Sequence, residues 1–455
     1  MATLNSSRGR IFWLAAAVLG VAVISVVMAR VRKPSELAVY TTAADRMSRG
    51  EEIYRPTDRK AFTYPPFFAI PFMPMNLLPE SYQPAIWWAI NLSLVGLSAW
   101  LLLQLTAVAR EESDRGRAAL WWTAGITALL SAKFMLLPLV YGSHDLLILV
   151  LMLASGLALG RGRQFSSGLV GGIAAACKAT PLLLLPFLIW QRKLRAAGLF
   201  VAAVFVATFL PDLLFPHPNH KPWVEFWYER FVAKVHVGAA PEASGAWKEW
   251  NELNQSLAGT VHRLATTAPS RRARINVAVL PIAKEQVKLV TLGLDCLVLA
   301  YCAWLSWPRK SLALRPGDQG LMALGYTSAV LCGMLLLSPM SSTYHFCLLL
   351  PPIAFLVTYW MYRERNWVVG GALVLQLVVS LLSGDLFGWW ADIALAAGLY
   401  TFAAAIQLAA CGYVLAWRMP RAVESARIQP KLAIHERLPG GQFRAQPPSL
   451  RAKAA

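Results

Sequence analysis

Residues 36–79 contain the side chains best suited to acid–base chemistry. This stretch begins polar and becomes aromatic and proline-rich at Phe62-Thr63-Tyr64-Pro65-Pro66. A carboxylate on such a segment can act as a general base, because it can take the proton of a reacting hydroxyl group. Any one of them could equally be a solvated surface charge, the commoner role for Asp and Glu. The carboxylates of this stretch are Glu36, Asp45, Glu51, Glu52 and Asp58.

Further polar side chains lie within or beside long apolar stretches. Ionisable groups in apolar surroundings are costly, so each is a candidate for function. Two have structural alternatives: His345 could be hydrogen-bonded by Ser341, and Lys178 could bond carbonyls freed by a break in its helix. The candidates of this kind are His144, Asp145, Lys178, Asn254, Ser256, Arg263 and His345.

The composition indicates which elements must position these side chains. Of the 455 residues, 57% are hydrophobic and only 15% are charged, and the mean hydropathy is +0.48. A soluble protein would carry about 25% charged residues. The apolar residues form runs of roughly 18 to 22, long enough to span a bilayer. The chain is therefore predicted to be an all-α polytopic membrane protein.

The charge and the cysteines exclude other classes of protein. The net charge of +19 lies in loops and in the tail, which favours contact with membrane lipids over nucleic acid. The six cysteines lie inside apolar segments and include no CxxC pair. Neither a disulfide framework nor a metal site is therefore expected.

The short loops predict the orientation. Loops rich in Lys and Arg alternate with connections that contain neither, at 141–145, 338–342 and 384–388. Positive loops stay in the cytoplasm, so both termini are predicted to lie inside. Ile11 to Met28 is interpreted as an uncleaved first span. The outer loops are then at about 30–85 and 215–285. The basic loops contain Arg115, Arg163, Lys193, Lys310 and Arg363.

One segment, Gly168 to Trp190, lies between two basic loops but is only about one span long. Two half-depth helices meeting at Lys178–Pro181 would return the chain to the side from which it came. Counting this hairpin as two gives about twelve membrane segments. They form a single domain over residues 1–417. Residues 418–455 are predicted to be a disordered basic tail on the cytoplasmic side, near anionic lipid.

The second outer loop has its own predicted structure. Trp223, Phe226, Trp227 and Phe231 recur at helical spacing, with charged residues between them. This pattern is typical of an amphipathic helix that lies in the membrane interface.

Taken in order, several short motifs resemble glycosyltransferase family 87, bacterial membrane mannosyltransferases of the C-type glycosyltransferase superfamily. Each motif alone is weak, and their shared order makes the resemblance specific. The motifs are Glu36-Leu-Ala-Val-Tyr40, Arg49-Gly-Glu-Glu-Ile-Tyr54, Tyr64-Pro-Pro66, Trp87 to Asn91, Gly142-Ser-His-Asp145, Gly171 to Pro181, Asn254-Gln-Ser256 with Arg263, and Ser338-Pro339 with His345.

The resemblance implies a C-type fold in the bacterial plasma membrane and a hexosyltransferase activity. The donor would be a polyprenyl-phosphate sugar, mannose by the family's habit, and the acceptor a glycolipid or glycan on the outer face. Glu36 occupies the family's acidic position and would be the general base, with Asp45 as its competitor. Arg263, Lys178 or His345 would stabilise the leaving phosphate. Tyr64, His144, Asp145, Asn254 and Ser256 would complete the substrate site, and no cofactor is implied.

Two departures from the family pattern affect these expectations. Family members generally carry Asp where Glu36 stands, which leaves the identity of the base open. They also tend to carry Gly-Gln-x-Asn where this chain has Gly142-Ser143-His144-Asp145, which could alter the sugar or the acceptor.

Two other classes of function compete with the enzyme. The interrupted segment at Lys178–Pro181 is also typical of a secondary transporter or a lipid-linked-sugar flippase. Such transporters often contain internal repeats, and none is found between the two halves of this sequence. A structural membrane scaffold is the third possibility, and the polar residues predicted on one face argue against it.

Overall fold

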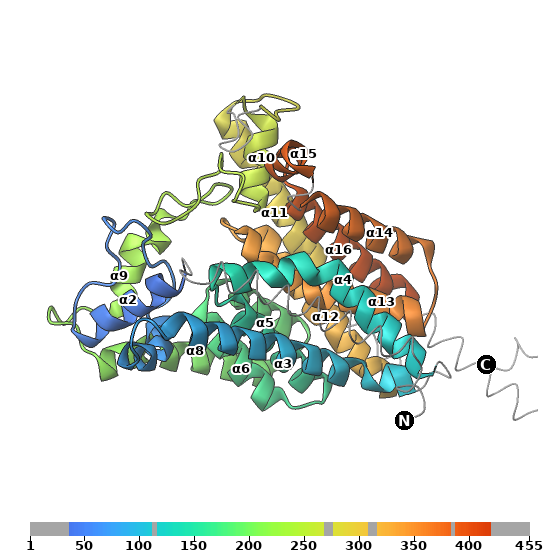
Figure 1. Cartoon of the computed structure of the whole chain (residues 1–455), viewed down its shortest axis with the longest axis horizontal. Helices are drawn as coiled ribbons and strands as arrows, with labels where there is room; N and C mark the ends of the chain where they lie inside the picture. Colours follow the sequence, from blue (N-terminus) through green and yellow to red (C-terminus); the bar gives the residue numbers. More distant parts are fainter. Residues whose placement is uncertain (1–35, 112–115, 268–275, 308–315, 384–386, 420–455) are drawn as a thin grey trace, which may run out of the picture.

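The computed structural model describes residues 36–111, 116–267, 276–307, 316–383 and 387–419 (Figure 1). These residues form helices and turns, with one isolated antiparallel bridge between Asn254 and Ser342 and no sheet. Seven of the described helices are long and apolar enough to cross a membrane, and four shorter apolar helices accompany them. The predicted all-α membrane fold is confirmed. The predicted first span and nearly all of the predicted tail lie outside the described residues.

The long helices form a bundle with a buried centre and a periphery of exposed apolar side chains. In 18-residue windows of the central spans Asp318–Leu337 and Thr343–Tyr362, 72% and 89% of the residues are buried, against 22% in a window of Lys284–Ser306. The long helices are α3 (Gln83–Glu111), α4 (Arg117–Tyr141), α8 (Leu194–Leu214), α11 (Lys284–Ser306), α12 (Pro316–Leu337), η4 (Thr343–Leu349) continued by α13 (Leu350–Tyr362), and α16 (Leu399–Tyr413) continued by a π-helical turn (Val414–Arg418).

The shorter apolar helices include the predicted half-depth hairpin. They are α5 (Asp145–Gly160), α6 (Gln164–Cys177), η2 (Thr180–Leu183) continued by α7 (Leu184–Trp190), and α14 (Trp367–Leu382). Helices α6 and α8 pack against each other at Gly168 with Ala196 and at Gly172 with Phe200. Because both members of these pairs advance in the same direction, α6 and α8 run parallel. Helix α7 must therefore return the chain to the end where α6 began, which confirms the hairpin.

The two long loops meet at one end of the bundle, called here the loop end and defined by residues 36–82, 215–267 and 276–283. The first loop contains α2 (Leu37–Ser48) and the 3-10 helix η1 (Pro66–Leu77), and the second contains α9 (Trp223–Arg230), η3 (Val232–Lys234) and α10 (Leu257–Ala265). The indole of Trp227 donates to the carbonyl of Thr63 at 3.1 Å, and Arg230 pairs with Glu52 at 3.0 Å. The predicted helix in the second loop is thus present as α9, at the left of Figure 1.

The basic turns at Arg161 and Arg363, which the structure describes, lie at the opposite end. Arg161 donates to Gln104 at the end of α3, and Arg363 pairs with Asp318 at 2.9 Å. The neutral connections at 141–145 and 338–342 instead lie at the loop end, where the N–H of Glu36 donates to the carbonyl of Tyr141 at 3.2 Å and Ser342 bridges to Asn254. The alternation of charged and neutral loops in the sequence therefore corresponds to two ends of one bundle.

Candidate active site

Asp145 is the centre of a buried polar cluster at the loop end. Helix α4 ends at Tyr141 and is capped by Gly142, whose positive φ of 67° suits glycine, and α5 begins at Asp145. The Asp145 carboxylate accepts a hydrogen bond from Lys178 Nζ at 2.5 Å and another from the hydroxyl of Ser143. His345 Nε2 lies 3.9 Å from its second oxygen. A carboxylate in the first turn of a helix is also favoured by the helix dipole.

The break after α6 carries Lys178 into this cluster. Helix α6 ends at Cys177, and the backbone of Lys178 is extended (φ −153°, ψ 132°) before η2 begins at Thr180. The Lys178 side chain is only 9% exposed. A buried ammonium group is stable only beside an anion, and this one bonds a carboxylate rather than carbonyls freed by the helix break.

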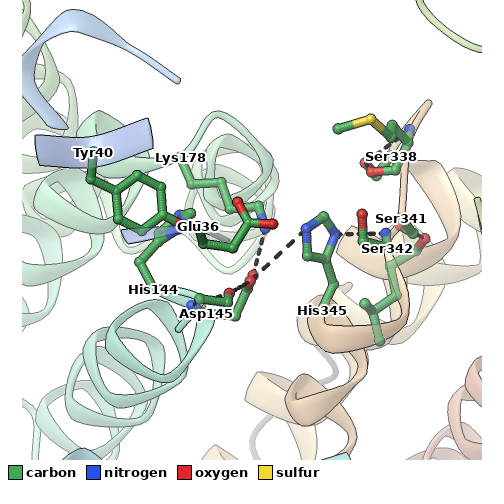
Figure 2. Close-up of polar contacts among 12 residues, drawn as sticks. Glu36, Tyr40, His144, Asp145, Lys178, Ser338, Ser341, Ser342 and His345 are labelled. Atoms are coloured by element: carbon green, nitrogen blue, oxygen red, sulfur yellow. Dashed lines mark hydrogen bonds and ion pairs between the residues drawn. The ribbon is translucent and has the colours of Figure 1, made fainter. Parts of the chain in front are cut away.

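His345 approaches the cluster from the other side, as Figure 2 shows. Its Nδ1 accepts a hydrogen bond from the N–H of Ser342 at 3.1 Å, so its partner is Ser342 and not the Ser341 considered from the sequence. Because Nδ1 accepts, the neutral ring carries its proton on Nε2, a tautomer assigned from this hydrogen bond. That N–H is directed toward Asp145.

The two candidate bases occupy different environments. Glu36 lies at the start of α2, its side chain is 2% exposed, and it forms an ion pair with Lys60. Asp45 lies near the other end of α2, is 42% exposed, and pairs with Arg49 at 2.8 Å. The structure brings Glu36 to the cluster (Figure 2) and leaves Asp45 on the surface.

His144 is enclosed by aromatic rings. Its ring centroid lies 4.6 Å from that of Tyr64 and 4.3 Å from that of Phe68. Burial lowers the pKa of His144 to about 3 and raises the pKa of Tyr40 and Tyr64 well above 10. The Tyr40 hydroxyl and His144 Nδ1 share a hydrogen bond of 2.9 Å whose direction depends on the His144 tautomer. His144 Nε2 is buried and has no hydrogen-bond partner among the described residues.

A polar cavity of about 880 Å³ opens beside Glu36. Its volume lies within the usual range for ligand sites in proteins. Lys60 and Arg59 line it from the first loop, Trp247 from the second loop, and Tyr344 from η4. It thus combines one candidate base with cations and with aromatic rings that can pack against a sugar ring.

A second cavity, of about 490 Å³, is mainly apolar. Among the described residues that line it, the charged or titratable side chains are those of Lys178, His345 and Tyr64. Such a cavity suits a lipid chain that ends in an anionic group, because the chain is buried against hydrocarbon while the cation and the imidazole N–H face the charge. Its apolar wall includes Leu182, Leu183, Val235, Leu337 and Met340.

Asn254 and Ser256 connect the second loop to the segment before His345. Asn254 Oδ1 accepts from the N–H of Ser341 at 3.2 Å. Ser256 caps α10 by accepting from the N–H of Gly259 at 3.1 Å. Both side chains are buried and line neither of the two cavities. Their positions indicate support of the site rather than contact with substrate.

Arg263 lies apart from the cluster. Its guanidinium donates to the carbonyl oxygens of Ala396, Asn251 and Asn254 at 2.6, 2.9 and 2.8 Å. Burial lowers its pKa to about 10, so it stays charged at neutral pH. The predicted contact of Arg263 with a leaving phosphate is not supported by this geometry, because its donors are used to hold α10 against α15 (Trp389–Ala396).

A comparison of the sequence with models of known protein families identifies the family of this chain. The model of glycosyltransferase family 87 matches residues 62–339, more than half of the 455 residues. The chain belongs to glycosyltransferase family 87. The family resemblance expected from the ordered motifs is thereby confirmed. The matched range contains His144, Asp145 and Lys178, whereas Glu36 precedes it and His345 follows it.

Named relatives are consistent with family 87. The chain is 30% identical over 187 residues to a polyprenol-phosphate-mannose-dependent alpha-(1-2)-phosphatidylinositol pentamannoside mannosyltransferase of Mycobacterium tuberculosis, covering 39% of this chain and 41% of the relative. It is 32% identical over 181 residues to the protein of that name in Mycolicibacterium smegmatis, covering 38% and 41%. The chain thus matches about two fifths of the length of these relatives.

Two further comparisons cover more of the chain. A polyprenol-phosphate-mannose-dependent alpha-(1-2)-phosphatidylinositol mannoside mannosyltransferase of Mycolicibacterium smegmatis is 25% identical over 72% of this chain and 73% of its own length. The apo crystal structure of ArnT from Cupriavidus metallidurans aligns over 94% of this chain and 82% of that chain, with 17% identity and a TM-score of 0.28. That score is too low to support an argument.

Some residues of this family-87 site were not found from the sequence. Lys60, the ion-pair partner of Glu36, lies 24 positions from it in the sequence. Tyr40, the hydrogen-bond partner of His144, lies 104 positions from it. Tyr40 belongs to one of the ordered motifs, which is a signal that could have identified it. Lys60 belongs to no motif and follows no periodic pattern. In the part of the chain that the structure describes, no group of three His, Cys, Asp or Glu side chains could hold a metal ion.

Proposed function

We propose that this protein transfers mannose from a polyprenyl-phosphate carrier to a hydroxyl group of a glycolipid or glycan. The observation that carries the proposal is the pairing of two cavities with different chemistry. The apolar cavity presents Lys178 and His345, and the polar cavity presents Glu36. Membership of family 87 and the polyprenol-phosphate-mannose dependence in the names of the relatives support the choice of donor.

The apolar cavity is the donor site in this proposal. The polyprenyl chain packs on its aliphatic wall, and Lys178 and the Nε2–H of His345 bind the phosphate oxygens. Both groups are directed toward Asp145. Asp145 holds Lys178 in place, and the arriving phosphate accepts a hydrogen bond from another N–H of the Lys178 ammonium group. The phosphate also accepts from His345 Nε2–H, which at 3.9 Å is not hydrogen-bonded to Asp145.

The polar cavity is the acceptor site, and Glu36 is the general base. The acceptor oxygen attacks the anomeric carbon from the side opposite the phosphate and forms the new glycosidic bond. The bond from that carbon to the phosphate oxygen breaks, and the phosphate leaves with the electron pair. The hydroxyl proton goes to the Glu36 carboxylate. A single displacement of this kind inverts the anomeric configuration.

The proposed location is the outer face of the bacterial plasma membrane. The basic turns lie at the end opposite to the site, and Lys and Arg in short loops are retained in the cytoplasm. The site at the loop end would then face outward, and both termini would be cytoplasmic. A donor already activated as a lipid phosphate suits a compartment without nucleotide sugars.

Transfer by purified protein tests this function. The protein in lipid nanodiscs is given synthetic polyprenyl-phosphate mannose with a radiolabel in the sugar, together with extracted membrane glycolipids. We expect label in the glycolipid fraction, and none when the donor is a nucleotide sugar. Transfer from the nucleotide sugar alone would overturn the proposal. Uptake of a solute into proteoliposomes without any transfer would favour the transporter.

A further inference from the structure

Five charged side chains line the polar cavity, and four of them form two ion pairs. Glu36 pairs with Lys60. Asp58 pairs with Arg46 through both carboxylate oxygens, one of which accepts from Arg46 Nη2 at 2.9 Å. These two pairs contribute no net charge to the cavity.

Arg59 is the fifth charged residue, and it gives the cavity an excess of one positive charge. Its side chain is exposed, and the described residues provide it with no hydrogen bond or ion pair. Its neighbours on the same loop differ in this respect, since Asp58 and Lys60 are both paired. Arg55, on the same loop, pairs with Glu51 at 2.5 Å and does not line the cavity.

The remainder of the cavity suits a saccharide. Trp247 and Tyr344 line it with aromatic rings, and Thr42 and Thr343 add hydroxyl groups. A guanidinium presents its donors in a planar fork that matches two oxygens of a phosphate group. The volume of about 880 Å³ accommodates a sugar together with such a substituent.

We propose that the polar cavity selects an acceptor sugar that carries a phosphate group, and that Arg59 recognises this negative charge. The inference rests on the proposed function, because it assigns the class of acceptor bound beside Glu36. Arg46 and Lys60 are not available for this task while their carboxylate partners hold them. Arg59 is therefore a specificity-determining residue that binds the acceptor and takes no part in proton transfer.

The test compares acceptors that differ in charge, in nanodiscs of phosphatidylcholine so that the bilayer adds no net charge. The neutral probe is octyl α-mannoside. The two anionic probes are its 6-phosphate, which represents a sugar phosphate, and phosphatidylinositol monomannoside, which represents a lipid phosphodiester. We expect the wild-type kcat/KM to be about tenfold higher for one anionic probe than for the neutral probe, because of a lower KM. A difference of about tenfold is the size expected from one hydrogen bond to a charged group. The probe that shows the effect identifies the source of the phosphate.

The variant Arg59→Gln should remove this tenfold preference, measured as the ratio of kcat/KM for the anionic probe to kcat/KM for the neutral probe. Arg59→Lys should keep part of it, because the charge remains but the fork is lost. Arg55→Gln is the matched control, since it removes the same charge from the same loop outside the cavity, and it should keep the full preference. An equal preference in wild type and Arg59→Gln would overturn the inference.

Direct binding keeps this test separate from the proposed function. Calorimetric titration of the same three probes into wild type and Arg59→Gln requires no turnover. Weaker binding of an anionic probe to Arg59→Gln alone supports the inference even if mannose is not the sugar transferred. Identical binding of all probes by both proteins refutes it, whether or not polyprenyl-phosphate mannose is a donor.

Discussion

Two buried carboxylates lie near the cavities, and their surroundings separate their roles. Asp145 is enclosed by Lys178, Ser143 and His345, and it lines neither cavity. Glu36 has one described ion-pair partner, Lys60, and lines a cavity large enough for a sugar. A general base must reach the proton that it removes. Glu36 meets this condition, and Asp145 is placed to orient the cations.

Removing the carboxylate of Glu36 should stop proton transfer. Glu36→Gln keeps the shape of the side chain but cannot accept a proton, so we expect kcat to fall roughly 10²–10⁴-fold with an unchanged KM for the donor. Glu36→Asp should keep part of the activity. Initial rates of mannose transfer at several donor concentrations measure both constants.

Asp45→Asn is the matched control, because it neutralises a carboxylate of the same helix outside the cavity. It should turn over at close to the wild-type rate. Normal turnover of Glu36→Gln together with loss of activity in Asp45→Asn would reverse the assignment of the base.

Arg263 should affect stability and not donor binding. Arg263→Gln leaves buried carbonyls of Ala396, Asn251 and Asn254 without their charged donor. We expect the free energy of unfolding to fall by about 3 kcal/mol or more, since hydrogen bonds to charged groups contribute about 1.5–3 kcal/mol each. Thermal unfolding in detergent measures this loss. An unchanged midpoint with a raised donor KM would instead support the phosphate contact predicted from the sequence.

At the scale of elements, two helix ends deliver the buried ion pair. Helix α5 begins at Asp145, and α6 ends immediately before Lys178. The hairpin depends on close packing of α6 against α8, which glycines allow. A Cβ atom added at Gly168 would lie 2.2 Å from the carbonyl oxygen of Ala196. The position of Lys178 therefore depends on residues that never touch it.

A single methyl group at this helix crossing should be costly. Gly168→Ala forces α6 and α8 apart, and overpacking of this kind costs about 1–3 kcal/mol. Gly198→Ala on α8 is the control, because its Cβ would have nothing within 4 Å and alanine favours a helix. We expect the thermal midpoint to fall for Gly168→Ala only. Equal midpoints for the two variants would show that the close approach is absent.

At the scale of the whole molecule, the two ends of the bundle differ in charge and construction. The loop end holds the cluster and both cavities, and the opposite end holds short turns with arginines such as Arg161 and Arg363. Ser48 is exposed at the loop end and Ser166 at the other end. Ser256, although it belongs to an outer-loop motif, is buried and is a poor labelling site.

Cysteine labelling measures the orientation that the charges predict. Cys296 is the exposed cysteine among those described, so it is first replaced by serine. In intact spheroplasts, an impermeant maleimide should label Ser48→Cys within minutes and Ser166→Cys only after permeabilisation. The reverse pattern would place the site in the cytoplasm and contradict the proposed outer-face transfer.

The sequence by itself determined the class of fold and the apolar segments, because these depend on local hydropathy. Its charged loops predict the sidedness of those segments, which stays a prediction. It predicted the break at Lys178, and its ordered motifs identified the family. The tertiary structure decided which polar residues meet. It brings Glu36 to Lys60 and Lys178 to Asp145, and it leaves Asp45 on the surface and Arg263 bonded to carbonyls. These pairings join residues far apart in the chain and depend on how helices pack, which no local pattern encodes.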